Sequence, residues 1–151
     1  MQRARHQKGA VAVEFALCCV AFLSLLLMAL EVARFAYLQN AAAEATRLGA
    51  RTAAMCDPNG TTDNVIYKKM RVLLPQLTAQ SQVKVSRKKV DTTTDCTSAD
   101  DCAFVTVSLN AVSVQTIIPL VTLGAVLPGT PTTLPREFMN STNNAVACTA
   151  P

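Results

Sequence analysis

Hydrophobic positions along the chain form one long apolar run near the N-terminus, followed by shorter patterns of different period. Residues 10–30 are almost wholly apolar, and Glu14 is the only charged residue among them. About 20 such residues in a helix cross a hydrocarbon core of roughly 30 Å. No proline and a single glycine, Gly49, occur between Ala10 and Met55. The sequence therefore predicts one helix over this whole range, with a membrane-spanning first half and a second half that projects outward.

The second half of this helix carries small residues at intervals of four, namely Ala41, Ala45, Gly49 and Ala53. Side chains four apart lie on one helix face, and a row of small ones lets another backbone approach closely. We expect this face to pack against the chain's own sheet. The alternatives are packing against a neighbouring subunit and the simple helix propensity of alanine.

A turn and a second, shorter helix are predicted after the long helix. Residues 57–60, Asp-Pro-Asn-Gly, have turn chemistry and end the first helix. Hydrophobic residues then recur at helical spacing between residues 61 and 78, and Thr62 or Asp63 is the expected N-cap. We expect this helix to belong to the core.

Two strands and an edge strand complete the predicted head. Residues 82–90 and 104–114 alternate hydrophobic and polar side chains, as strands with one solvated face do. In the second stretch the alternation changes parity, which indicates a bulge or bend near Asn110. An edge strand is expected at residues 134–139, where Pro135 excludes a central position. These elements predict an α+β fold, in which a long N-terminal transmembrane helix precedes a small antiparallel-sheet head with a second helix.

The charge pattern indicates membrane orientation and does not favour nucleic-acid binding. The net charge of +4 over 151 residues is too small and too scattered for a nucleic-acid partner. Arg3, Arg5 and Lys8 precede the apolar run without an acidic residue among them, which predicts a cytoplasmic N-terminus by the positive-inside rule. The other basic cluster, residues 87–89, ends a predicted strand without interleaved aromatic residues, so we expect it to be solvated.

Six cysteines fall into two groups by position. The adjacent pair at residues 18–19 lies inside the apolar run, where a free thiol behaves as a small hydrophobe. The other four would lie across the membrane in an oxidising compartment, where an even number predicts two disulfides. Of the three pairings we favour Cys96–Cys102, which flank a short polar loop, and therefore Cys56–Cys148. A four-cysteine zinc site is the competing interpretation, although its C-x2-C spacing is absent.

The sequence contains no recognisable catalytic, cofactor or metal-binding motif. The single histidine, His6, lies on the other side of the apolar run from the predicted head, so no nucleophile of the head has an imidazole base. The aspartates of the loop at residues 91–101 lack the spacing and the glycine of an EF-hand. We therefore predict a structural protein, not an enzyme, with no metal and no cofactor.

The stretch KGAVAVEF, residues 8–15, does not suit an ordinary signal peptide. Such a peptide is cut after its apolar stretch, but here the run is too long and is followed by charged residues. A cut between Gly9 and Ala10 would instead release a basic leader of nine residues. It would also leave a free amine one helical turn from Glu14, near the positive end of the helix dipole, which favours a carboxylate.

This arrangement resembles the type IV prepilin signal, with Gly9 as the last leader residue, Ala10 as the new N-terminus, Glu14 as the processing and assembly glutamate, and Phe15 in the aromatic position. The following helix, ALEVARFAYLQNAAAEATRLGARTAA, is similar to that of the TadE-like pseudopilins of tight-adherence (Tad, Flp) type IVb pili. The residues that match this helix signature are Arg34, Glu44, Arg47, Gly49 and Arg51.

The resemblance implies a pilin-like helix, cleavage by a prepilin peptidase, insertion in the inner membrane, and a role as a minor pilin in pilus assembly, adherence and biofilm formation. The implied partners are the membrane, the peptidase, other pilins and Tad secretion and assembly components. The expected division is a leader at 1–9, a transmembrane assembly half at 10–31, an extracytoplasmic helix half at 32–56 and an α+β head at 57–151. The alternative is a single-pass, membrane-anchored extracytoplasmic binding module that never enters a fibre.

Overall fold

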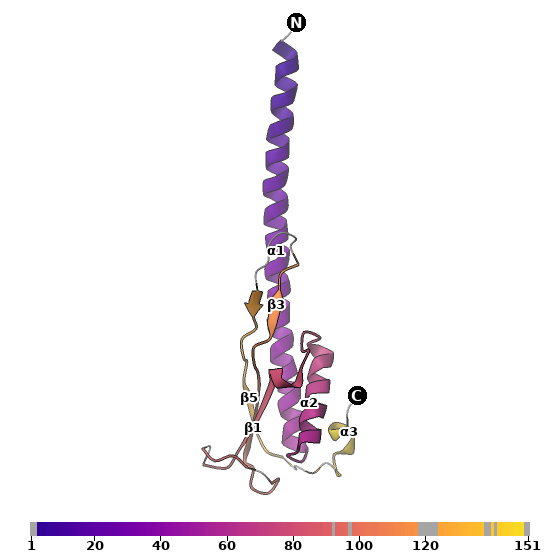
Figure 1. Ribbon diagram of the computed structural model, residues 1–151, viewed down its shortest axis with the longest axis vertical. Helices are drawn as coiled ribbons and strands as arrows, with labels where there is room; N and C mark the ends of the chain where they lie inside the picture. The colour runs from indigo at the N-terminus through magenta and orange to yellow at the C-terminus, as the bar shows by residue number, and fades with distance from the viewer. Residues whose placement is uncertain are drawn as a thin grey trace.

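One long helix carries a small head along its C-terminal half, while its N-terminal half stands free (Figure 1). This computed structural model describes residues 3–91, 93–96, 98–117, 124–137, 140 and 142–149, and the side chains of residues 3–8 and 60 lie outside the description. The elements in chain order are α1 (Arg3–Met55), α2 (Gly60–Leu73), the short 3-10 helix η1 (Gln80–Gln82), β1 (Val83–Lys88), β2 (Phe104–Leu109), β3 (Ser113–Gln115), β4 (Gly124–Val126), β5 (Thr132–Pro135) and α3 (Ala145–Cys148). This order confirms the predicted α+β fold.

Helix α1 ends at Met55 as predicted, but it begins at Arg3 instead of Ala10. It therefore includes most of the predicted leader, of which Met1 and Gln2 lie outside the described residues. The most apolar window of α1 has a mean hydropathy of 2.5, and none of it is buried by the head. The helix is long and apolar enough to cross a membrane.

Helix α2 is capped by Asn59, whereas the sequence predicted Thr62 or Asp63. Asn59 has an extended backbone, and its Oδ1 accepts a hydrogen bond of 2.8 Å from the Thr62 amide. Thr62 is itself buried in the first turn, so its side chain is not placed to cap the helix. The helix ends at Leu73, earlier than predicted, because Pro75 disfavours helical backbone in the residue before it.

Strands β1, β2 and β5 form an antiparallel sheet with β2 in the centre. Every second residue of β2, from Val105 to Leu109, is buried, as the alternating pattern predicted. Strand β5 is an edge strand, in agreement with the position of Pro135. It occupies residues 132–135 and not 134–139 as predicted, while residues 138 and 139 lie outside the description.

The parity change after β2 marks a turn at which the chain passes from one sheet to another. Of the predicted bulge or bend near Asn110, the bend is therefore confirmed and the bulge is not. Strand β2 ends at Leu109, and Ala111 has a left-handed backbone with φ 50°. Strand β3 then pairs with β4 in a separate two-stranded antiparallel sheet. The turn at Ala111 leaves both Val112 and Val114 buried, so the hydrophobic alternation resumes with the opposite parity.

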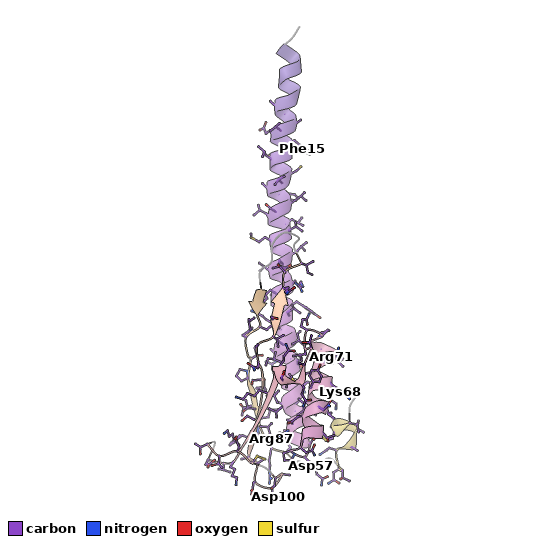
Figure 2. The ribbon with its side chains drawn as sticks, viewed as in Figure 1. Phe15, Asp57, Lys68, Arg71, Arg87 and Asp100 are labelled. Atoms are coloured by element: carbon purple, nitrogen blue, oxygen red, sulfur yellow. A yellow bond between two sulfur atoms is a disulfide. The ribbon has the colours of Figure 1, made fainter. Side chains whose placement is uncertain are left out.

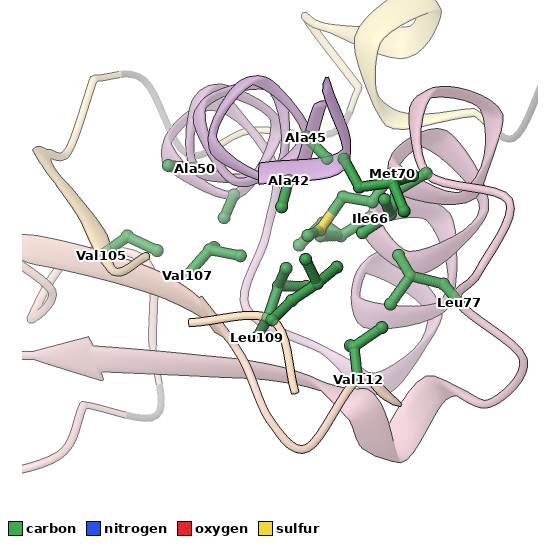
Figure 3. Packing of buried hydrophobic residues seen from close by; sticks show 14 of the residues in the cluster. Ala42, Ala45, Ala50, Ile66, Met70, Leu77, Val105, Val107, Leu109 and Val112 are labelled. Carbon is green, nitrogen blue, oxygen red and sulfur yellow. The ribbon is translucent and has the colours of Figure 1, made fainter. Parts of the chain in front are cut away.

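The small residues of α1 form the face that packs into the head (Figure 3). Ala42, Ala45, Ala50 and Ala53 are fully buried. They lie in one cluster with the inward side chains of α2 and β2, so α1 contacts a helix as well as the sheet. The predicted packing of this face against the chain's own sheet is confirmed, and α2 is a further partner.

Two disulfides close the head. Cys56 at the end of α1 is bonded to Cys148 in α3, and Cys96 is bonded to Cys102 in the loop between β1 and β2. This pairing is the one favoured from the sequence, and it leaves no thiolate among these four for a zinc ion. The cysteines at residues 18–19 are free.

The basic cluster at the end of β1 is paired with carboxylates. Only Arg87 contradicts the predicted solvation, because the side chains of Lys88 and Lys89 remain 31% and 41% exposed. Arg87 Nη2 lies 2.5 Å from Asp63 Oδ1 on α2, and only 10% of the Arg87 side chain is exposed. The next two lysines bond to aspartates of the following loop, in the pairs Lys88–Asp95 at 2.7 Å and Lys89–Asp101 at 3.4 Å. These aspartates belong to helix α2 and to the loop after β1. The local charge pattern around residues 87–89 therefore does not predict the pairs.

Local hydrogen bonds shape the loop between β1 and β2. The Asp91 carboxylate accepts a bond of 2.6 Å from the Thr94 hydroxyl, and bonds of 3.1 Å and 3.3 Å from the amides of Thr94 and Thr93. These bonds, above all the one from the Thr94 hydroxyl, hold the pKa of Asp91 below its ordinary value of 3.8, because they favour the charged form. The described residues contain no cluster of side chains arranged to hold a metal ion.

Candidate processing and assembly site

The predicted processing residues lie together on the free half of α1. Gly9, Ala10 and Glu14 are exposed, and Phe15, labelled in Figure 2, is 70% exposed. A side chain built at Gly9 would meet nothing within 4 Å. Because α1 runs without interruption through the Gly9–Ala10 bond, this bond lies on a helix surface that the head does not cover.

Ala10 and Glu14 are one helical turn apart, so they lie on the same face of α1. Their separation along the axis is about 6 Å. A carboxylate inside an apolar run is costly in a bilayer, and a positive charge one turn away offsets part of this cost. A cut before Ala10 would create such a charge on its amine.

The four disulfide cysteines lie at the other end of the molecule from the processing residues. Cys56 directly follows α1, and its partner Cys148 belongs to α3, which lies beside the C-terminal end of α1 in Figure 1. The predicted site residues therefore form two separate groups, one on the free helix and one that closes the head.

Arg34 docks the second sheet on α1. Its Nη1 donates a hydrogen bond of 3.0 Å to Glu31 Oε1 on the same helix and another of 3.0 Å to the backbone carbonyl of Gln115 at the end of β3. The side chains of Arg34 and Glu31 are 30% and 22% exposed. The sequence marks Arg34 as part of the helix signature but does not reveal its role. The spacing of three residues predicts the contact with Glu31, whereas no local pattern predicts a bond to the Gln115 carbonyl, 81 residues away.

Gly49 lies where α1 meets both α2 and β2. A Cβ atom at this position would lie 2.7 Å from Met70 Sδ, and 3.2 Å from both Met70 Cγ and Val107 Cγ1. Met70 and Val107 are fully buried, so neither side chain has solvent to move into. The glycine of the helix signature therefore permits the close approach of three elements.

A comparison with protein families finds a match within the long helix. Residues 9–51 match the TadE-like protein family. The TadE-like segment begins at Gly9 and ends at Arg51, so it contains the predicted cut site, the apolar run, the docking residue Arg34 and the packing residue Gly49. No curated protein and no solved structure matches the chain.

The remaining charged residues of the TadE-like segment face solvent. Glu44 and Arg47 form an exposed pair, with 3.6 Å between the Glu44 Oε2 and Arg47 Nη1 atoms. Arg51 is exposed and lines a hollow of about 300 Å³ between the end of α1 and β5. The segment thus has a buried face that holds the head and an exposed charged face on the other side.

Proposed function

We propose that the protein is a minor pilin or pseudopilin of a Tad pilus. A prepilin peptidase cuts it between Gly9 and Ala10, and the apolar half of α1 anchors it in the inner membrane with the head on the extracytoplasmic side. From there it takes part in pilus assembly together with other pilins and the Tad secretion and assembly components. Surface adherence and biofilm formation depend on it through the pilus.

One observation carries this proposal, namely the uncovered apolar half of a helix that matches the TadE-like family. The apolar window of α1 has no surface buried by the head, and the exposed side chains at Phe15, Phe22, Leu25 and Met28 would be unfavourable in water. Lipid covers this apolar surface before assembly, and neighbouring helices cover it in a fibre. The family is generally structural, which agrees with a subunit and not an enzyme.

The disulfides and the basic flank support the proposed orientation. Two disulfides in a head of this size are typical of an oxidising compartment. Arg3, Arg5 and Lys8 precede the apolar run, as the positive-inside rule requires of a cytoplasmic end. Both features favour a head outside the membrane and a cut site on the cytoplasmic side.

The decisive experiment is mass analysis of the N-terminus of the protein isolated from membranes of its native host. Cleavage predicts a mature chain that begins at Ala10, and deletion of the prepilin peptidase should restore the longer chain. An N-terminus at Met1 or Gln2 in cells with active peptidase would refute processing. It would favour the alternative, a membrane-anchored extracytoplasmic module that stays outside the fibre.

The role of Glu14 is tested by comparing Glu14→Ala with Glu14→Asp. If the carboxylate offsets the Ala10 amine in an apolar assembly, Glu14→Ala should reduce processing or incorporation into sheared fibres more than Glu14→Asp does. Ser24→Ala is the control, because it removes another polar side chain from the same free half of α1, and the Ser24 hydroxyl bonds to the Ala21 carbonyl of its own helix. Normal processing and normal fibre content in both Glu14 variants would contradict this account.

A further inference from the structure

The β3–β4 hairpin lies beside α1 at the point where the apolar run ends. Arg34 Nη1 donates a hydrogen bond of 3.0 Å to the carbonyl of Gln115, the last residue of β3. A hollow of about 250 Å³ separates the two elements next to this bond. Its lining consists of Glu31, Val32, Arg34 and Phe35 from α1 with Val114, Thr116 and Ala125 from the hairpin side.

The chain from β2 to β3 runs antiparallel to α1, toward its free half. Val107 lies against Gly49, and Gln115 bonds to Arg34. The eight residues from Val107 to Gln115 cover at most about 26 Å, because the turn at Ala111 shortens an otherwise extended chain. The 15 helical residues between Arg34 and Gly49 rise about 22 Å, so the two lengths are compatible. Figure 1 shows β3 alongside α1, closer to the N-terminal end of the helix than β1 or β5. Thr116 and Ile117, the next two described residues, therefore lie toward the apolar run.

The apolar run sets the position of the hairpin relative to a bilayer. Residues 10–30 rise about 32 Å, which matches a hydrocarbon core of roughly 30 Å. Arg34 lies about 6 Å beyond Leu30 along the helix axis, which is within a headgroup layer of roughly 5–8 Å. Gln115 is at the level of Arg34, and Ile117 lies two residues, or about 6.6 Å, closer to the membrane. Ile117 is thus placed at the edge of the hydrocarbon core.

The chemistry of this end of the hairpin suits lipid. Ile117 is 69% exposed, and its neighbour Thr116 carries no charge. An isoleucine side chain left in water forfeits the favourable free energy of burying its apolar surface. Val32 of α1, which lines the hollow together with Thr116, is 65% exposed, so α1 presents further apolar surface beside the hairpin.

We infer that the β3–β4 hairpin is a second membrane contact of the head, in which Ile117 enters the boundary between lipid headgroups and acyl chains, an inference that rests on the transmembrane placement of α1 proposed above. The hairpin and α1 then attach the head to the membrane at two points, and the bond from Arg34 to Gln115 links the hairpin to the helix. The occupant of the exposed Ile117 surface is lipid, because the level of the hairpin coincides with the end of the apolar run. A contact with a neighbouring subunit is the competing outcome.

Tryptophan fluorescence tests this inference directly, because the chain contains no tryptophan. Four single variants of the full-length protein are reconstituted in vesicles of phosphatidylcholine and phosphatidylglycerol, with and without brominated acyl chains that quench tryptophan on contact. Ile117→Trp probes the hairpin end, and Leu25→Trp reports whether α1 is in the bilayer. Val126→Trp is the matched control on the same hairpin, since Val126 is 62% exposed but pairs with Ser113, farther from the membrane. Val146→Trp is an exposed control in α3.

Brominated lipid should cause a loss of emission from Leu25→Trp and from Ile117→Trp, a smaller loss from Val126→Trp, and none from Val146→Trp. Quenching of Leu25→Trp without quenching of Ile117→Trp would overturn the inference while leaving the membrane-spanning helix intact. A blue-shifted but unquenched Ile117→Trp would assign the surface to a protein contact and would also overturn it. An unquenched Leu25→Trp would remove the proposed membrane placement together with the inference, and equal quenching of Val146→Trp would refute a specific lipid contact.

Discussion

Replacement of Gly49 by alanine tests whether the head packs on α1 through one close contact. The added Cβ would lie 2.7 Å from Met70 Sδ and 3.2 Å from Val107 Cγ1. Overpacking of a buried site costs about 1–3 kcal/mol, and the better helix propensity of alanine returns about 1 kcal/mol. We therefore expect Gly49→Ala to lower the free energy of unfolding of the head by up to about 2 kcal/mol.

The sign of this effect should reverse when Met70 is shortened. Met70→Ala alone should cost about 2–5 kcal/mol, because it leaves a cavity in the core. In that background the Cβ of Gly49→Ala no longer meets Met70 Sδ, and Val107, the other neighbour at 3.2 Å, can shift into the space that the Met70 side chain vacates. The substitution should then gain about 1 kcal/mol from helix propensity. The coupling free energy between the substitutions at Gly49 and Met70 should then be about 1–3 kcal/mol.

The assay is urea unfolding of the four proteins of this cycle in detergent micelles, with the head followed by near-ultraviolet circular dichroism. Ala43→Gly serves as the control, because Ala43 is a partly exposed position on the same helix. It should cost about 1 kcal/mol in both backgrounds. If Gly49→Ala has the same effect with and without Met70→Ala, the contact with Met70 does not explain the glycine.

Three further variants test other parts of the head. Asp63→Asn should cost about 1.5–3 kcal/mol of unfolding free energy, because it leaves the mostly buried Arg87 without its counter-charge; an unchanged urea midpoint would contradict this. Cys148→Ser opens a covalent loop with a sequence separation of 92 and should cost about 2–5 kcal/mol, measured in the same way. The carboxyl resonance of Asp91 should titrate below 3.8 in the intact protein, so its stabilising contribution is present at neutral pH and is lost as the pH falls through that lowered pKa; Thr94→Val should move the titration upward, and no movement would refute the assigned cause.

Features that depend on neighbouring residues in the sequence were predictable. The proline-free stretch from Ala10 to Met55 predicted α1 because continuous backbone hydrogen bonding needs no distant partner. The pair Cys96–Cys102 followed from a short loop, and Cys56–Cys148 followed by elimination. The TadE-like segment was recognisable because its motif residues are closely spaced on one helix.

Features that depend on distant partners were missed. Arg87 was expected to be solvated, but Asp63 of α2, 24 residues away in the sequence, pairs with it. The parity change near Asn110 was interpreted as a bulge or a bend, because periodicity alone does not distinguish a bulge within a strand from a turn into another sheet. Similarly, the sequence placed Arg34 in the helix signature, while its bond to Gln115 became visible only when β3 was in place.

The Cys56–Cys148 bond determines how the protein would respond to mechanical tension. It joins the residue just after α1 to the last residue of α3, so the intervening head forms a closed covalent ring. A pull applied between α1 and the segment that follows Cys148 would pass through two sulfur atoms and would bypass the hydrogen bonds of both sheets. Tension along this path would therefore leave the fold of the head intact.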